Sequence, residues 1–186
     1  MTTQEGPRIN PDHLRQGAPT GTFVESYPRH LCGTDNAIGA SGVEHCTAIA
    51  LQAGDVITNI TFVTGGTAAV NPSAGYAVLR TAAGAKLAQT ADFGSTARAA
   101  NTAYTVALAS AYTITQAGIY LVGISFTADT APTLRGLTVG NVAMAGAIGL
   151  SAVVLAKTHG SAVGATAPST VATPTTVATP CYFALT

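Results

Sequence analysis

The side chains that could do chemistry gather between Arg29 and Cys46, in the stretch RHLCGTDNAIGASGVEHC. It holds His30, Cys32, His45 and Cys46, and two imidazoles with two thiolates are a known zinc ligand set. His30 and Cys32 would share a face of an extended segment, whereas the adjacent His45 and Cys46 point to opposite faces of a strand. The spacing also matches no usual structural zinc pattern. We therefore expect no metal and no cofactor, and these four residues are the only zinc candidates.

The thiols of the same stretch allow two other interpretations. A disulfide between Cys32 and Cys46 would close a loop of about 15 residues and add about 3 kcal/mol of stability. It would need oxidation after release from the cell, and a total of three cysteines argues against a closed disulfide framework. The favoured interpretation is a glycine-rich hinge, containing Gly33, Gly39 and Gly42, with Cys46 as a small buried apolar residue.

Catalytic motifs are missing from the rest of the chain. The patterns GxSxG, GxxxxGK[ST], HExxH, GxGxxG and SxxK do not occur, and no close pair of acidic residues stands in a predicted strand. The sequence therefore predicts a protein that is not an enzyme.

Charge is scarce as well as balanced. The chain has eight basic and eight acidic residues, and charged residues make up 9% of it, against about 25% in ordinary soluble domains. The balance gives no reason to expect nucleic acid or an anionic membrane surface as a partner. A surface with so few charges favours self-association, so we expect part of it to be buried against other chains.

The first 44 residues predict an extended N-terminal arm and hinge. Residues 1–44 are rich in glycine, proline and polar residues and show no sustained hydrophobic period. No basic segment followed by an apolar run marks a secretory signal. We therefore expect synthesis in a reducing cytoplasm, with the cysteines as thiols.

Residues 45–186 predict a β-sandwich domain. Apolar and polar residues alternate in 56–63, and further strand-like runs lie at 75–80, 102–108, 111–115 and 181–185. The run 118–126 is continuously apolar, as in a strand covered on both faces. Short β-rich runs separated by turn residues predict an all-β fold, an antiparallel jelly-roll-like β-sandwich. Its predicted core includes Ile60, Phe62, Leu121 and Ile124.

Residues 137–180 predict a long Gly/Ala/Thr/Pro-rich loop region before the final strand. The uncharged stretch 136–156 has the length of a membrane span. It lacks the density of large apolar residues and the aromatic belts that such spans carry. We expect no membrane span, and we expect 137–180 to lie at the interface of a homo-oligomer, most simply a homotrimer.

Several strand and turn phrases carry a family resemblance. LQAGDVITNITFVTGGTAAVNP, KLAQTAD, NTAYTVALASAYTITQAGIYLVGISF, APTLRG and the terminal PCYFALT resemble the β-sandwich proteins of actinobacteriophage (mycobacteriophage-type) virions. Proteins of that family are commonly described as minor tail proteins, and similar modules occur in head fibres. The resemblance covers about 46–136 and the last seven residues. It implies a structural or adhesion role, often in trimers, and it supplies no catalytic residues.

These observations together predict a non-enzymatic structural component of a bacteriophage virion, most simply a minor tail protein. The N-terminal arm would contact other virion structural proteins. A capsid decoration or head-fibre protein would use the same design of arm and sandwich. The alternative from another class is a carbohydrate-binding module for a host-surface glycan. Its aromatic platforms would have to be tyrosines, because the chain has no tryptophan.

Overall fold

The structure is a computed structural model that describes residues 23–38, 42–138, 155–160, 163–171 and 173–186. Its regular elements are β-strands and one 3₁₀ turn, η2 (Arg29–Leu31), with no α-helix in those residues. The strands are β1 (Val24–Glu25), β2 (Thr34–Ala37), β3 (Glu44–Leu51), β4 (Val56–Val63), β5 (Ala74–Thr81), β6 (Lys86–Gln89), β7 (Ala103–Thr113), β8 (Gly118–Thr127), β9 (Thr133–Gly136), β10 (Ala156–His159), β11 (Thr175–Thr176) and β12 (Phe183–Leu185). The predicted all-β class is confirmed.

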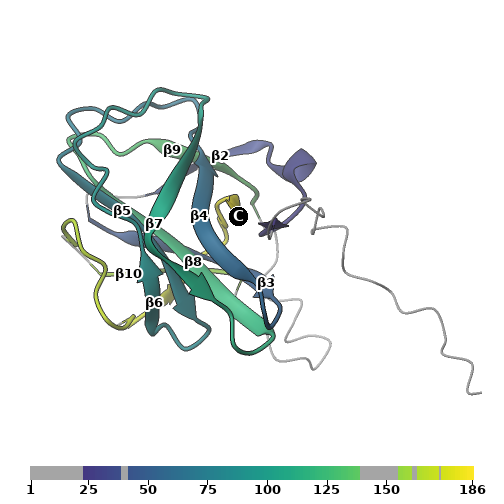
Figure 1. The fold of residues 1–186 in the computed structure, drawn as a ribbon. Helices are drawn as coiled ribbons and strands as arrows, with labels where there is room; N and C mark the ends of the chain where they lie inside the picture. Colours follow the sequence, from purple (N-terminus) through teal and green to yellow (C-terminus); the bar gives the residue numbers. More distant parts are fainter. Residues whose placement is uncertain (1–22, 39–41, 139–154, 161–162, 172) are drawn as a thin grey trace, which may run out of the picture.

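The strands form two antiparallel sheets that face each other (Figure 1). The smaller sheet has the order β1-β12-β4-β7, and the larger has the order β11-β10-β3-β8-β5-β6; β2 and β9 form a separate two-stranded ribbon. The pairs β1·β12, β2·β9, β3·β8, β4·β7 and β5·β6 are nested along the chain. A long antiparallel ribbon of nested pairs, wrapped so that alternate pairs enter different sheets, is the jelly-roll arrangement.

The hydrophobic core lies between the two sheets. Ile60, Phe62 and Ile124 have no exposed surface, and Leu121 is 2% exposed, which confirms the predicted burial of all four. The Phe62 ring lies within 6 Å, centroid to centroid, of the rings of Phe93, Tyr104 and Phe126. This aromatic cluster joins β4, β7 and β8 with the loop that follows β6.

The first half of β4 differs from the predicted alternation. Val56 was expected on the same face as Ile60 and Phe62, but Val56 is exposed and Ile57 is fully buried. The register with β7 shifts between Ile57 and Asn59, and the backbone N–H groups of Thr58 and Asn59 both donate to the carbonyl of Thr186, at 2.6 and 2.7 Å. An irregularity of this kind moves the side chains that precede it to the opposite face.

Residues 23–38 belong to the sandwich and do not form part of an arm. Strand β1 pairs with β12, and β2 pairs with β9. Val24 is 2% exposed in the core, and the buried Asn36 side chain donates from Nδ2 to the Pro180 carbonyl at 2.9 Å. The predicted boundary at residue 44 is therefore too late, because such short strands show no periodicity. Residues 1–22 of the predicted arm lie outside the described residues.

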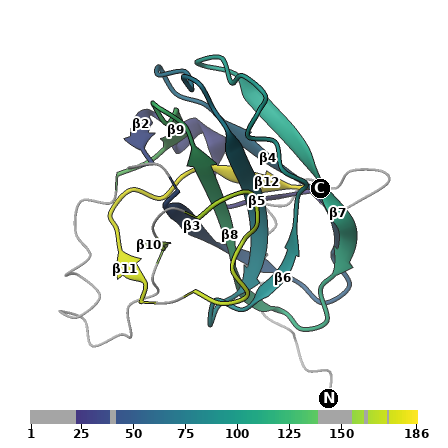
Figure 2. The same cartoon turned by 90° about the vertical axis from the view of Figure 1, so that its left-hand side faces the viewer.

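The described parts of 137–180 pack on the protein's own larger sheet. Strand β10 pairs with β3, and Ala167 and Val163 pack on Tyr76 and Val78 of β5. Figure 2 shows this C-terminal segment, in yellow-green to yellow, crossing in front of the larger sheet. The central strand β8 is consequently buried on both faces from Leu121 to Phe126, as its apolar run predicted. Residues 139–154, where much of the predicted interface falls, lie outside the described residues.

Candidate functional site

The four predicted zinc candidates do not come together. His30 is exposed in the η2 turn, and Cys32 is partly exposed just after it. On β3, His45 hydrogen-bonds the backbone of Ile38, whereas Cys46 packs with Ala48 and Leu121 away from the main core. The three cysteines of the chain are free thiols, so the disulfide considered between Cys32 and Cys46 is not present. Cys46 is buried as expected, but its thiol is not in purely apolar surroundings.

The outer face of the larger sheet carries a cluster of buried polar side chains. We call Glu44, Cys46, Tyr76, Arg80 and His159 the charge cluster. Side chains alternate along each strand, so Glu44 and Cys46 share one face of β3, and Tyr76 and Arg80 share the same face of β5. His159 on β10 lies directly opposite Glu44 in the register. Each of these five residues is at most 5% exposed.

A bidentate ion pair lies at the centre of the charge cluster. Arg80 donates from Nε to Glu44 Oε1 at 2.7 Å and from Nη2 to Glu44 Oε2 at 2.8 Å. The Tyr76 hydroxyl donates to Oε2 at 2.7 Å. Two parallel bonds between a guanidinium and a carboxylate give both strength and a fixed geometry. Glu44 and Arg80 therefore hold β3 and β5 together across the intervening strand β8.

The same arginine also attaches the segment that covers it. Arg80 Nη1 donates to the carbonyl of Gly84 at 3.1 Å and to that of Pro168 at 2.9 Å. Gly84 lies in the turn after β5, and Pro168 lies in the described C-terminal segment. The guanidinium is thus hydrogen-bonded from Nε, Nη1 and Nη2, and it links the sheet to its cover.

Glycine at position 123 makes this ion pair possible. Gly123 lies on β8, between Cys46 on β3 and Val78 on β5. A Cβ atom built there would lie 2.5 Å from Glu44 Oε1 and 2.9 Å from a Val78 methyl group. The Glu44 side chain therefore crosses β8 in space that any other residue would fill.

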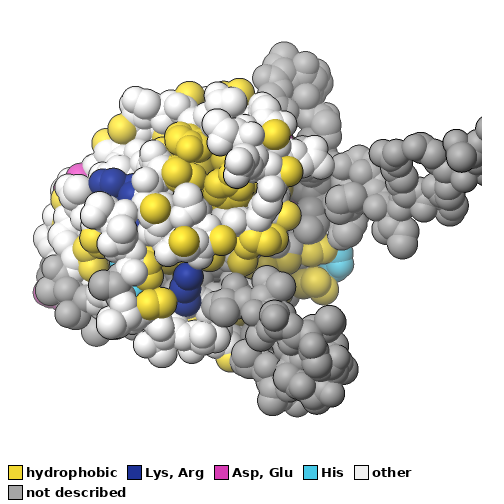
Figure 3. Space-filling view, turned by 90° about the horizontal axis from the view of Figure 1, so that it is seen from below, with side chains coloured by type: hydrophobic (Ala, Val, Ile, Leu, Met, Phe, Trp, Pro, Cys, Tyr) yellow, Lys and Arg dark blue, Asp and Glu magenta, His cyan; other side chains and the backbone are white. Residues whose placement is uncertain are grey.

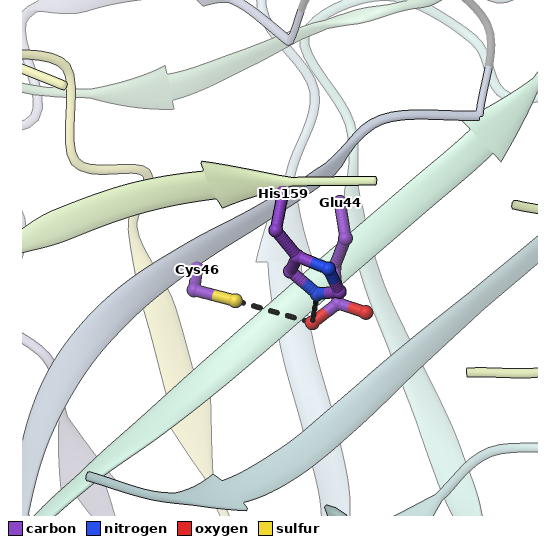
Figure 4. A group of neighbouring side chains, drawn as sticks. All are labelled: Glu44, Cys46 and His159. Atoms are coloured by element: carbon purple, nitrogen blue, oxygen red, sulfur yellow. Dashed lines mark hydrogen bonds and ion pairs between the residues drawn. The ribbon is translucent and has the colours of Figure 1, made fainter. Parts of the chain in front are cut away.

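Cys46 and His159 complete the cluster, and both contact one oxygen of the Glu44 carboxylate (Figure 4). The Cys46 thiol donates to Glu44 Oε1 at 3.1 Å. His159 Nε2 also lies 3.1 Å from Oε1, close enough for an ion pair. The direction of that contact does not satisfy hydrogen-bond geometry, so buried Nε2 has no hydrogen-bond partner among the described residues.

The electrostatics of the cluster fix which groups are charged. Burial by itself raises the pKa of Glu44, but the close contact with His159 and the hydrogen bonds and charge of Arg80 outweigh it and lower this pKa to about 2. Burial and the neighbouring Glu44 charge raise the pKa of Cys46 well above its usual value. At neutral pH the cluster therefore holds a carboxylate and a protonated thiol, and the thiol is the less nucleophilic form of cysteine.

Sequence reasoning did not identify four members of the cluster. Tyr76 and Arg80 lie in a run that predicts only a strand, although their even spacing does place them on one face. Glu44 precedes Cys46 by two residues, but no second acidic residue nearby marks it as part of a site. His159 lies in the segment that had no periodicity, and nothing in its surroundings indicates a contact with β3.

A second feature is a shallow groove between the edges of the two sheets. It has a volume of about 280 Å³ and lies between β6 and β7. Its lining residues are Lys86, Leu87, Ala88, Gln89, Ala109, Ser110, Ala111 and Tyr112. Gln89 Oε1 already accepts from Lys86 Nζ at 3.1 Å and from the backbone of Ala167 at 3.2 Å. The groove combines an aromatic ring with small and polar side chains.

Comparison with known proteins adds no relative: no protein-family model matches the chain, and no curated protein matches it. Within the described residues, no helix has the length and hydrophobicity needed to cross a membrane.

Proposed function

We propose that the chain is a non-catalytic structural component of a bacteriophage virion, most simply a minor tail protein. A capsid decoration or head-fibre position is the alternative placement for the same function. The observation that carries the proposal is an uncharged sheet face. We define the β4–β7 face as the outward side chains of the paired strands β4 and β7: Asn59, Thr61, Val63, Ala103, Thr105 and Ala107.

The β4–β7 face has the character of a surface that another protein covers. Its residues are small and uncharged, and Thr61 and Thr105 are joined across the strands by a hydroxyl–hydroxyl hydrogen bond of 2.8 Å. The edge strand β7 contains no lysine or proline, the residues that commonly protect an exposed sheet edge. Figure 3 shows the same character on another side, where charged side chains are few and isolated among hydrophobic and neutral ones.

A second copy of this chain is the proposed occupant of the β4–β7 face, in a homotrimer. Like surfaces that carry no charge can meet without repulsion, and small side chains allow close approach. The described part of 137–180, which the sequence assigned to the interface, already packs on the larger sheet. The β4–β7 face is therefore the better choice for the contact between copies. Attachment to other virion proteins is proposed for residues 1–22.

Purified phage particles provide the test. Mass spectrometry and antibody labelling of particles from the phage that encodes the chain should detect it at a fixed position in the virion. The variant Thr105→Asp places a charge in the middle of the proposed contact, and it should reduce incorporation severely. The matched control is Thr96→Asp in the exposed loop after β6, which should be incorporated normally. Particles that lack the wild-type chain would refute the virion assignment.

The groove between β6 and β7 favours one second candidate, a carbohydrate-binding module. Tyr112 offers a ring of the kind that sugars stack on, and Ser110, Lys86 and Gln89 offer polar contacts. Its volume of about 280 Å³ is just below the usual range for ligand sites, which starts at about 300 Å³, so it would accept a small glycan unit. A glycan array with the wild type and Tyr112→Ala distinguishes this candidate, because binding that Tyr112→Ala abolishes would support it.

A further inference from the structure

The charge cluster contains three convergent ligand atoms. Glu44 Oε1, Cys46 Sγ and His159 Nε2 all lie within 4.8 Å of one another, and the side chains point toward one another in Figure 4. Of these three atoms, Nε2 is buried and has no hydrogen-bond partner among the described residues. An imidazole nitrogen that carries no hydrogen is an acceptor, as a carboxylate oxygen is, so two such atoms repel each other when they face. A proton or a cation between them removes that conflict, and buried polar atoms normally have such a partner.

The charges around these three atoms determine which cation can fit. Arg80 already neutralises Glu44 through two hydrogen bonds, and the positive charge of Lys157 acts on Cys46. A divalent ion bound by one thiolate would therefore leave an uncompensated positive charge in a buried site, which is costly. A monovalent ion bound by the same thiolate leaves no such charge. Thiolate and imidazole ligands suit copper(I), the soft monovalent ion of biology.

We propose that Cys46 and His159 bind one copper(I) ion, with Glu44 Oε1 beside it. On binding, the S–H bond of Cys46 breaks and an S–Cu bond forms, while the proton leaves to solvent. His159 binds through the Nε2 lone pair, and copper stays in the +1 state throughout. This site lies on the larger sheet, away from the β4–β7 face, and it does not depend on the proposed virion function.

Burial sets the route by which the ion enters. The side chains of Glu44 and His159 are 0% and 2% exposed, so the ion must enter during folding or when the C-terminal segment opens. Strand β10, which carries His159, is attached to β3 along one edge. An ion that joins Cys46 of β3 to His159 of β10 would bind only the closed form, and it would therefore stabilise the folded state.

The test uses the full chain with Cys32→Ser in every sample, since Cys32 is a partly exposed thiol. Protein is refolded without oxygen in the presence of copper(I) alone and then challenged with a copper(I) chelator. We expect one equivalent of copper to be retained per chain. Cys46→Ser and His159→Asn should each lower that retention at least tenfold. Cys181→Ser, which removes the other buried thiol, should leave it unchanged.

Three results would overturn the proposal. The first is that the parent protein retains no copper, and the second is equal retention by His159→Asn. The third is tighter binding of zinc(II) than of copper(I) at the same residues, which would contradict the charge argument. X-ray absorption of the copper-loaded Cys32→Ser protein needs no further variant. It therefore identifies the copper ligands even where Cys46→Ser or His159→Asn fails to fold. It should show one sulfur and one nitrogen ligand, and a spectrum without either would refute the site.

Discussion

Replacing Arg80 by methionine should destabilise the fold severely. The Glu44 and Arg80 side chains have no exposed surface, and their two hydrogen bonds measure 2.7 and 2.8 Å. The variant keeps much of the volume but removes the charge, so the Glu44 carboxylate stays buried without a compensating cation. Removing one partner of a buried ion pair typically costs about 3–5 kcal/mol. The bonds to the carbonyls of Gly84 and Pro168 would be lost as well.

A partly exposed ion pair in the same protein supplies the matched control. Arg135 Nη1 lies 2.8 Å from Asp35 Oδ1, and the two side chains are 33% and 36% exposed. Water screens such a pair, and exposed pairs contribute about 0–1 kcal/mol. Arg135→Met should therefore cost far less than Arg80→Met, although both variants remove an arginine from an ion pair.

Urea denaturation followed by circular dichroism measures both variants. We expect the free energy of unfolding to fall by about 3–5 kcal/mol for Arg80→Met and by less than about 1 kcal/mol for Arg135→Met. The double variant Glu44→Gln/Arg80→Met should recover part of the lost free energy of unfolding, because it removes the uncompensated charge of the Glu44 carboxylate. If Arg80→Met and Arg135→Met cost the same, the argument that the buried pair supports the sheet is wrong.

Further predictions concern the aromatic core, the contact between Gly123 and Glu44, and the dependence of stability on pH. Phe62→Ala should cost about 3–5 kcal/mol in the same denaturation assay, as large core truncations do; a change near zero would contradict its central position. Gly123→Ala should destabilise through contact with Glu44, whereas Gly118→Ala on the same strand meets no atom within 4 Å and should not; equal losses would refute the crowding argument. Burial lowers the pKa of His45 from 6.5 to about 4, so the unfolded chain takes up a proton first and stability should fall as the pH drops from 6.5 to 4. His45→Gln should remove that loss, and an unchanged pH profile would contradict it. The pKa of Glu44 is lowered from 4.5 to about 2, so Glu44 contributes stability above pH 4.5. That stability is lost as the pH falls from 4.5 to 2, in the wild type and in His45→Gln alike.

The sequence predicts most of the strands that are long or buried. The continuous apolar run of β8 and the alternation around Ile60 and Phe62 are local signals, and the structure confirms both. The irregularity at Ile57 could not be predicted, because it depends on how Thr58 and Asn59 share the carbonyl of Thr186. A contact with the far end of the chain leaves no trace in the local pattern.

The short strands and the charge cluster could not be predicted from local sequence patterns, because both depend on contacts between distant segments. Strand β1 has two residues and becomes a strand only by pairing with β12. The cluster takes its residues from β3, β5 and β10, so its members are separated by long stretches of sequence. Cys46 was noticed because of its residue type, but its partners Glu44 and His159 follow only from the strand register. The resemblance to phage virion proteins remains a prediction.

Hydrogen exchange of the protein inside and outside assembled phage particles tests the proposed role most directly. In free protein, amides of β7 (Ala103–Thr113) that are not bonded to β4 should exchange quickly, because the strand lies at the edge of its sheet. In purified particles we expect strong protection of β7 and of β4 (Val56–Val63), since another copy covers the β4–β7 face. The amides of β8, buried in both states, serve as the internal reference. Exchange of β7 at the same rate in the particle and in the free protein would contradict the proposed contact between copies.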